Sequence, residues 1–354
     1  MRPLRLSDRI GQIMSAFRSW KFWVGILVSA ICIVFAFWNI NLRTLLHAFV
    51  GIKWPWFFIA VIWVAFILYV RAYRWKFLLG HIKWIGTFSL FQATTIGFAV
   101  NNLLPARVGE LVRSYAISKK ENIKFSGAFA TVVAERIYDV ISFTFILVLF
   151  LSIFSIPAFD KLGIKQSKLT MGIALIFIFG VALIVLLRTK EKAVEAFVRK
   201  FFGIFSKKWA DKLADEVASF SIGISHNLGL REILALVFIS PFIWIISTFQ
   251  FWMAAKSLGV DLGIQGCFML MVAVLFGISV PASPGYVGTY HLFAMKILQA
   301  LGYKAEQALS IAIIVHITNY APQIVMGLIS LKSMGLGLKE AAKSAKPTEA
   351  ADSQ

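Results

Sequence analysis

The sequence predicts an all-α polytopic membrane protein with about six full transmembrane helices and two re-entrant or broken helical hairpins in an inverted repeat. Composition is the first observation behind this prediction. Of the 354 residues, 59% are hydrophobic and only 15% are charged, against about 25% charged in soluble domains. The mean hydropathy is +0.79. Because a water-soluble fold of this length cannot enclose so much apolar surface, a soluble enzyme, a disordered chain and a disulfide scaffold are excluded.

The spacing of the apolar segments is the second observation. A helix needs about 20 mainly apolar residues to cross a bilayer. Six segments approach that length, namely 22–38, 56–70, 129–151, 169–187, 233–255 and 305–331. Two others, 86–104 and 263–280, run into proline-containing motifs. We expect each of these two to enter and leave the membrane on the same side.

The basic residues are the third observation, because they orient the chain. There are 36 Lys and Arg against 17 Asp and Glu, a formal charge of +19. In a soluble protein this excess would suggest nucleic acid, whereas in a membrane protein it marks cytoplasmic loops. With a cytoplasmic N-terminus, 27 basic residues fall on the cytoplasmic side and eight outside, with Arg136 alone inside a span. The cytoplasmic segments are 1–21, 71–85, 105–127, 188–231 and 332–354.

This orientation divides the chain into three parts, placed in the cell inner membrane with both termini cytoplasmic. Residues 1–21 form a basic cytoplasmic N-terminus that is not a cleavable signal, 22–331 a single transmembrane domain, and 332–354 a disordered cytoplasmic tail. The loop 188–231 carries aromatic and basic residues at helical spacing, which is typical of an amphipathic segment in the membrane interface. No nucleic-acid partner is expected.

A short motif occurs twice and indicates an internal repeat. Pro105-Ala-Arg-Val-Gly109 and Pro281-Ala-Ser-Pro-Gly285 share the pattern Pro-Ala-x-x-Gly, 176 residues apart. Each copy follows an interrupted apolar segment. The half-repeats, 22–151 and 169–331, would each hold three full spans, so the second half would be inverted relative to the first. Transporters use such repeats to bring broken helices together at a central site.

The first candidate site surrounds the first copy of that motif. Arg107, Glu110 and Arg113 are spaced by three and share one helical face. Arginine suits a phosphate, because it offers planar bidentate donors and does not lose its charge. We expect Asn101 and Asn102 to hydrogen-bond a headgroup. Pro105 and Gly109 would shape the break in the helix.

The second candidate site lies early in the segment 129–151. Glu135 and Asp139 are four residues apart and face the same way, with Arg136 beside them. The first two sites together hold three arginines and three acids, a formal sum of zero. Two interpretations stay open. One is a structural ion-pair network, and the other is a polar cavity in which the arginines hold an anionic headgroup while Glu110, Glu135 and Asp139 orient them or relay protons.

The third candidate site follows the second copy of the motif. Its helix-breaking residues are Pro281, Pro284, Gly285 and Gly288. Ser283 and Tyr290 would line a cavity, and His291 could titrate near neutral pH. His316 and Asn319 lie one turn apart in the last span, where hydrogen bonding between helices is the simpler interpretation.

Several chemistries have no motif in the sequence. There is no phosphate-binding loop, no nucleophile elbow and no metal-ligand spacing. Cys32 and Cys267 lie in apolar segments, which predicts small buried side chains and not a disulfide. We therefore expect no metal, no cofactor and no enzymatic activity.

Three motifs, taken in order, carry a resemblance to a known family. They are Asn101-Asn-Leu-Leu-Pro105-x-Arg107-x-Gly109-Glu110-x-x-Arg113, then Glu135-Arg136-x-x-Asp139, then Pro281-x-x-Pro284-Gly285-x-x-Gly288. Together they resemble the transmembrane region of lysylphosphatidylglycerol synthases, the flippase-like membrane family, from about residue 20 to 331. The resemblance implies a lipid or lipid-linked substrate and a flippase-type activity, without the aminoacyl-transferase domain of the bifunctional members. Members of this family often carry Glu where this chain has Tyr290, which puts substrate and coupling in doubt.

The sequence thus predicts a flippase that moves an anionic or phosphate-bearing lipid through a polar groove between two re-entrant hairpins. Its expected partners are membrane lipids, either anionic phospholipids or polyprenyl-phosphate-linked lipids. Two alternatives stay open, a membrane-embedded enzyme of phospholipid or polyprenyl-phosphate metabolism and an accessory protein that organises envelope synthesis. The pattern does not decide between a monomer and a homo-oligomer.

Overall fold

The computed structural model describes residues 20–38, 40–104, 108–156, 163–189, 228–280 and 282–336, with the single residues 159, 192, 196 and 199. In this part of the chain every regular element is helical. The elements are α2 (Trp20–Phe37), α3 (Leu42–Val50), α4 (Trp54–Leu79), α5 (Thr87–Leu103), α6 (Gly109–Glu121), α7 (Phe125–Ile153), α9 (Gln166–Thr189), α12 (Leu230–Ser257), α13 (Gly263–Ser279), the 3₁₀ turn η2 (Pro284–Tyr286), α14 (Thr289–Ala300) and α15 (Ala305–Ser333). The all-α prediction is confirmed.

Four of these helices, α4, α7, α12 and α15, are long and apolar enough to cross a membrane. A fifth span results if α2 and α3 are counted together across their 86° bend. Each of the six predicted spans falls within a helix, but the count of six and the inversion of the repeat stay predictions. The amphipathic segment 188–231 and both predicted tails lie almost wholly outside the described residues.

The chain divides into two compact units, and each is described by itself. The first unit contains residues 1–68, 92–113 and 246–354, and the second contains 69–91 and 114–245. Four helices, α4, α5, α6 and α12, contribute residues to both units.

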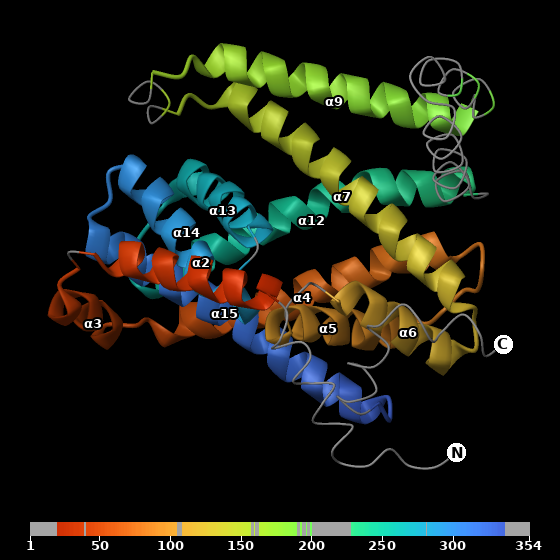
Figure 1. The fold of residues 1–354 in the computed structure, drawn as a ribbon, viewed down its shortest axis with the longest axis horizontal. Helices are drawn as coiled ribbons and strands as arrows, with labels where there is room; N and C mark the ends of the chain where they lie inside the picture. Colours follow the sequence, from red (N-terminus) through yellow and green to blue (C-terminus); the bar gives the residue numbers. More distant parts are fainter. Residues whose placement is uncertain are drawn as a thin grey trace. The chain divides into compact units, whose positions relative to one another are not determined.

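In each of two helical hairpins of the first unit, a glycine lets the two helices approach closely, and the contacts have the same sequence spacing. A Cβ on Gly97 of α5 would meet the Gly109 carbonyl oxygen at 2.9 Å and the Arg113 Cβ at 3.1 Å. A Cβ on Gly277 of α13 would meet the Thr289 oxygen at 3.0 Å and the Phe293 Cβ at 3.2 Å. Each glycine therefore faces the residues 12 and 16 positions later, as an internal repeat would require. In both predicted re-entrant segments the chain turns back on itself, and α13 and α14 lie side by side (Figure 1).

Helix α15 packs along α5 through small and polar residues. Gln92 donates to the Ser333 hydroxyl at 2.8 Å, and Thr95 donates to the Ser330 hydroxyl at 2.9 Å. About one turn beyond the second bond, Gly327 lies against Ala99, so closely that a Cβ on Gly327 would overlap with the Ala99 Cβ. Small residues permit such close approach between helices in a membrane, where hydrophobicity alone does not drive association.

In the second unit, α7 and α9 form a hairpin closed by one side chain (Figure 1). The Gln166 amide donates to the Leu151 carbonyl at 2.8 Å and to the Phe154 carbonyl at 2.6 Å, and it accepts from the Ile156 N–H at 2.8 Å. Gln166 thus satisfies backbone groups that the end of α7 leaves without helical partners.

The contact at Gly327 predicts a large effect of a small substitution. Gly327→Leu should lower the free energy of unfolding in detergent by about 1–3 kcal/mol, because the added side chain overpacks the α5–α15 seam. The control is Gly180→Leu in α9, where a Cβ meets no described atom within 4 Å. Unfolding followed by circular dichroism should show the control unchanged or slightly stabilised, and equal losses in both variants would contradict this packing.

Candidate functional site

A buried charge network in the second unit joins α4 to α7. Arg71 and Arg74 are three residues apart on α4, and Glu135 and Asp139 are four apart on α7. Residues at these spacings lie on one face of a helix. Each helix therefore presents two like charges, and the two pairs have opposite sign.

Arg74 is the centre of this network. Its Nη1 lies 2.6 Å from Asp139 Oδ1, and its Nη2 lies 3.1 Å from Glu135 Oε1. Nη1 also donates to the Ser240 hydroxyl of α12 at 3.0 Å. The side chains of Arg74 and Glu135 are 0% exposed. Removing one partner from such a pair leaves an uncompensated buried charge.

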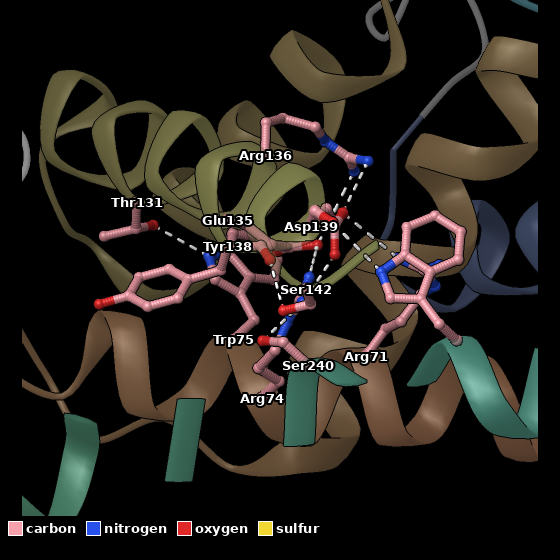
Figure 2. A network of polar contacts seen from close by, with 11 residues as sticks. Arg71, Arg74, Trp75, Thr131, Glu135, Arg136, Tyr138, Asp139, Ser142 and Ser240 are labelled. Atoms are coloured by element: carbon pink, nitrogen blue, oxygen red, sulfur yellow. Dashed lines mark hydrogen bonds and ion pairs between the residues drawn. The ribbon is translucent and has the colours of Figure 1, made fainter. Parts of the chain in front are cut away.

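Arg71 and Arg136 approach the carboxylates from other directions. Arg71 Nη1 lies 3.5 Å from Asp139 Oδ2, and its guanidinium lies over the Trp244 ring at 5.6 Å. Arg136 Nη1 lies 3.1 Å from Asp139 Oδ2, and Nη2 lies 3.7 Å from Glu135 Oε1. Figure 2 shows Arg136 on one side of the two carboxylates and Arg74 on the other. The side chain of Arg136 is 42% exposed, whereas that of Arg71 is 10% exposed.

Indole and hydroxyl groups hold the helices around the network in register. Trp75 of α4 donates to the Thr131 hydroxyl of α7 at 2.9 Å, one turn before Glu135. Trp244 of α12 donates to the Asp139 carbonyl at 3.2 Å. These bonds join α4, α7 and α12 at the level of the charges.

The network carries a formal charge of +1, since three arginines face two carboxylates. In membrane-spanning helices an excess charge is costly and indicates a functional site by default. A partly exposed guanidinium in this setting is suited to a phosphate or carboxylate.

The first predicted site lies in the first unit and forms a separate polar arrangement. Asn101 accepts from the Gly109 N–H at 2.7 Å and donates to Glu110 Oε2 at 3.2 Å. Asn101 thus caps the start of α6, as side-chain oxygens do at helix N-termini. Arg113 is 2% exposed. Arg107 and Pro105 lie outside the described residues.

The third predicted site also lies in the first unit, where α13 gives way to α14. The Ser283 N–H donates to Ser29 Oγ at 2.8 Å, and the Ser283 hydroxyl donates to the Val287 carbonyl at 3.3 Å. Tyr290 is 0% exposed, and the His316 Nε2 lies 2.8 Å from the Gly285 carbonyl oxygen. The residue before this turn, Pro281, lies outside the described residues.

An amide chain brings the first predicted site to the third. Asn102 donates to Gln323 Oε1 at 2.9 Å, and Gln323 donates to Asn319 Oδ1 at 2.6 Å. The carbonyl oxygen of Asn102 lies 3.5 Å from the position of a Cβ on Gly285. Asn102 and His316, expected in separate roles, therefore border one junction.

The structure extends the sequence-based picture at one helix. Helix α4 continues to Leu79, beyond the predicted end of the span at residue 70, so Arg71 and Arg74 lie in a helix and not in a loop. The charge balance of the first two predicted sites did not include these two arginines, which pair with Glu135 and Asp139.

Sequence reasoning missed four residues of the network, namely Arg71, Arg74, Ser240 and Trp244. The arginines carried a usable signal. They are three apart directly after an apolar segment, and two acids on one face of α7 require cations that Arg136 alone cannot supply. Ser240 and Trp244 carried no such signal, because an apolar helix contains many similar positions. Among the described residues, no three His, Cys, Asp or Glu lie close enough to hold a metal.

The fold and the buried network define a class, that of polytopic α-helical membrane proteins with ionisable groups inside the membrane. The lysylphosphatidylglycerol synthase TM region family matches residues 22–327. A UPF0104 membrane protein of Methanocaldococcus jannaschii is 21% identical over 88% of this chain and 94% of its own length. One of Pyrococcus horikoshii is 23% identical over 89% and 98%. Glycosyltransferase AglD of Haloferax volcanii is 25% identical over 68% of this chain and 42% of its own length.

The chain belongs to the lysylphosphatidylglycerol synthase transmembrane family, and the relatives that it matches over nearly their full length are UPF0104 membrane proteins. The family resemblance expected from the three motifs is therefore confirmed. The roles of individual residues as lipid ligands stay predictions.

The burial of Arg74 predicts that it matters more for stability than Arg136. Arg74→Met should cost about 3–5 kcal/mol of unfolding free energy, because it leaves two neighbouring carboxylates buried with less compensation. Arg136→Met should cost much less, since Asp139 keeps Arg71 and Arg74 as partners. Equilibrium unfolding in mixed micelles measures both losses, and an equal loss in the two variants would contradict this assignment.

Proposed function

We propose that this protein is a lipid flippase, which moves a lipid with an anionic or phosphate-bearing headgroup between the two leaflets. The observation that carries the proposal is the network of three arginines and two carboxylates inside membrane-spanning helices. A lipid phosphate would neutralise its formal excess of one positive charge. Such a site gives a headgroup a favourable position inside the bilayer, where it otherwise has none.

Arg136 is the residue that would hold the phosphate. Its side chain is 42% exposed while its guanidinium stays within reach of both carboxylates. Glu135 and Asp139 orient the guanidinium, and the planar fork can present other N–H groups to a phosphate oxygen. Arg71, stacked on Trp244, would contribute positive potential nearby.

Arg74, Glu135 and Asp139 support the Arg136 site from the buried side of the network. Arg74 contacts Glu135, Asp139 and Ser240, and its side chain is fully buried. It therefore offsets the negative charge of the acids without facing the headgroup. The carboxylates act in this proposal as supports for the arginines and not as proton carriers.

The family and the relatives favour a lipid as the transported molecule. The family description names a lysylphosphatidylglycerol synthase, and lysylphosphatidylglycerol is a lipid that bears a phosphate. A relative named as a glycosyltransferase favours a phosphate-bearing lipid linked to a sugar as a second form of the same substrate class. The proposal places the protein in the cell inner membrane, with membrane lipids as its partners.

That same relative favours one alternative, an enzyme that acts on a lipid-linked sugar. The two functions differ in their products. A flippase redistributes a lipid without changing it, whereas an enzyme yields a new molecule. An accessory protein of envelope synthesis would do neither by itself.

Leaflet exchange in liposomes tests the proposal. Purified protein should accelerate the exchange of a fluorescent phosphatidylglycerol over protein-free liposomes, and Arg136→Gln should slow that exchange at least about tenfold. The estimate follows from the loss of a charge-assisted hydrogen bond of about 1.5–3 kcal/mol. Dithionite quenching of the outer leaflet measures the rate.

Two controls make this measurement specific. Arg43→Gln removes an exposed arginine from α3, outside the network, and should exchange lipid at the wild-type rate. Mass spectrometry of the recovered lipids should show no conversion. Wild-type protein that exchanges neither phosphatidylglycerol nor a polyprenyl-phosphate lipid faster than empty liposomes would sink the flippase proposal, and a new lipid product would favour the enzyme.

A further inference from the structure

The junction between α13 and α14 in the first unit is built from polar groups that carry no formal charge. Helix α13 ends at Ser279, and α14 begins at Thr289. Between them, Gly285, Tyr286 and Gly288 have φ of 71°, 55° and 100°, so the backbone turns through left-handed conformations. A break of this kind between two membrane helices leaves backbone groups that need partners.

Two histidines brace this turn, and their hydrogen bonds set their tautomers. His316 lies with Nε2 2.8 Å from the Gly285 carbonyl oxygen, so Nε2 carries the proton and donates. The Gly288 N–H points to His291 Nδ1 at 3.5 Å, so that nitrogen accepts and the proton of His291 lies on Nε2. The two ring centroids are 4.8 Å apart. This pattern accounts for a pair of neutral rings.

Charged residues of the surrounding helices lie away from the two rings. Helix α13 and the first-unit part of α5 carry no charged residue, and the charged residue of α2 is Lys21, at the start of that helix. On α14, Lys296 is exposed, and on α15, Glu306 and Lys332 stand ten and sixteen residues from His316. On the adjacent α6, Glu110 is bonded to Asn101, and Arg113 packs against Gly97. The titratable groups at the rings themselves are Tyr286, Tyr290 and Tyr320.

Tyr290 contributes a buried hydroxyl group to this junction. It is 0% exposed, and its hydroxyl has no hydrogen-bond partner among the described residues. Its ring lies 4.8 Å from His316 and 5.6 Å from Tyr320. A buried hydroxyl left unsatisfied costs about 1–3 kcal/mol, so a ligand that accepts its hydrogen bond would be stabilising.

Other donors lie nearby on α14 and α15. The chain from Asn102 through Gln323 ends with Asn319 accepting through its oxygen, which leaves its amide N–H groups as donors one turn from His316. His291 Nε2–H is a further donor, while its Nδ1 accepts from the Gly288 N–H at the start of α14. The junction thus offers hydrogen-bond donors without a carboxylate, and a helix N-terminus adds a favourable potential for an anion.

We propose that this junction binds the phosphate group of the transported lipid together with one proton, which the His291–His316 pair takes up as the phosphate arrives. The proposal rests on the proposed flippase function and names how the charge of the headgroup is offset in the first unit. Without an anion, a charged imidazole here would be unpaired inside the membrane and costly. With a phosphate beside it, the same charge has a partner.

Coupling between the two ligands is reciprocal. A phosphate that favours the proton must itself be bound more tightly when the proton is present, by the same factor. Binding should therefore weaken as the pH rises, by up to about tenfold in apparent Kd per pH unit where one proton is taken up. A lipid monoanion and its proton would enter the site with no net charge.

Calorimetry of the purified full-length chain in nanodiscs of phosphatidylcholine tests this coupling. Titration with short-chain phosphatidylglycerol in two buffers of different ionisation enthalpy gives the number of protons taken up. We expect about one proton per lipid for the wild type. His291→Gln and His316→Gln should take up none, although glutamine can keep the bonds to Gly288 and Gly285. The matched control His47→Gln, at an exposed histidine of α3, should behave as the wild type.

The outcomes separate this inference from the flippase proposal. Lipid exchange without proton uptake in the wild type, or uptake that persists in His291→Gln/His316→Gln, overturns the inference and leaves the flippase standing. The same uptake with inorganic phosphate alone supports the anion site and assigns it to free phosphate. If a histidine variant fails to fold, the pH dependence of lipid exchange by the wild type tests the coupling instead. An exchange rate that does not change between pH 6 and 8 rejects the coupling.

Discussion

The pairing of two buried carboxylates on α7 with arginines from α4 is the interaction on which the second unit depends. Arg74 contacts Glu135, Asp139 and Ser240 at distances of 3.1 Å or less, in a fully buried position. A single arginine at this depth would be costly, and so would a single acid. Helices α4 and α7 can hold these charges inside the membrane only when the charges are paired. The ion pairs therefore fix how the two helices are aligned along their length.

The other features of the unit follow from that constraint. Helix α4 extends past its apolar segment to Leu79 because the acids of α7 make Arg71 and Arg74 tolerable inside it. The indole N–H groups of Trp75 and Trp244 donate hydrogen bonds to α7, beside the charges. Arg136 is the most exposed of the three arginines of the network, so the proposed function assigns the external anion to its guanidinium.

In the first unit, neutral side chains bridge most of the helix breaks, beside the charged Glu110 and Arg113 of α6. Its breaks are bridged by amides, hydroxyls and imidazoles, such as Asn101 at the start of α6 and His316 at Gly285. Gly97 and Gly277 permit close contact with α6 and α14, in each case with residues 12 and 16 positions later in the chain. Gly327 permits the same close contact between α15 and α5. Buried neutral groups cost little when each has a hydrogen-bond partner. Among the described residues of this unit, the Tyr290 hydroxyl has none, and neither do Thr94 Oγ1 and Gln250 Oε1.

The helices were largely predictable because apolar length and helix breakers are local properties of the sequence. All six expected spans lie in helices, and both interrupted segments fold back. Glu135, Arg136 and Asp139 were also recognisable from charge inside an apolar segment. Arg71 and Arg74 had a weaker signal, their spacing of three after an apolar segment, because basic residues at the end of a span look the same whether they face the cytoplasm or a partner acid more than 60 residues away. Pairing across that separation is a tertiary property, as is the approach of Asn102 to Gly285.

A cryo-electron microscopy structure in nanodiscs of anionic phospholipid would show whether the half-exposed side of the charge network holds a lipid phosphate. We expect headgroup density with phosphate oxygens about 2.7–2.9 Å from the Arg136 guanidinium, while Arg74 keeps its contacts with Glu135 and Asp139. A map that resolves Arg136 with its guanidinium enclosed by protein groups alone, and lipid density elsewhere, would contradict this expectation.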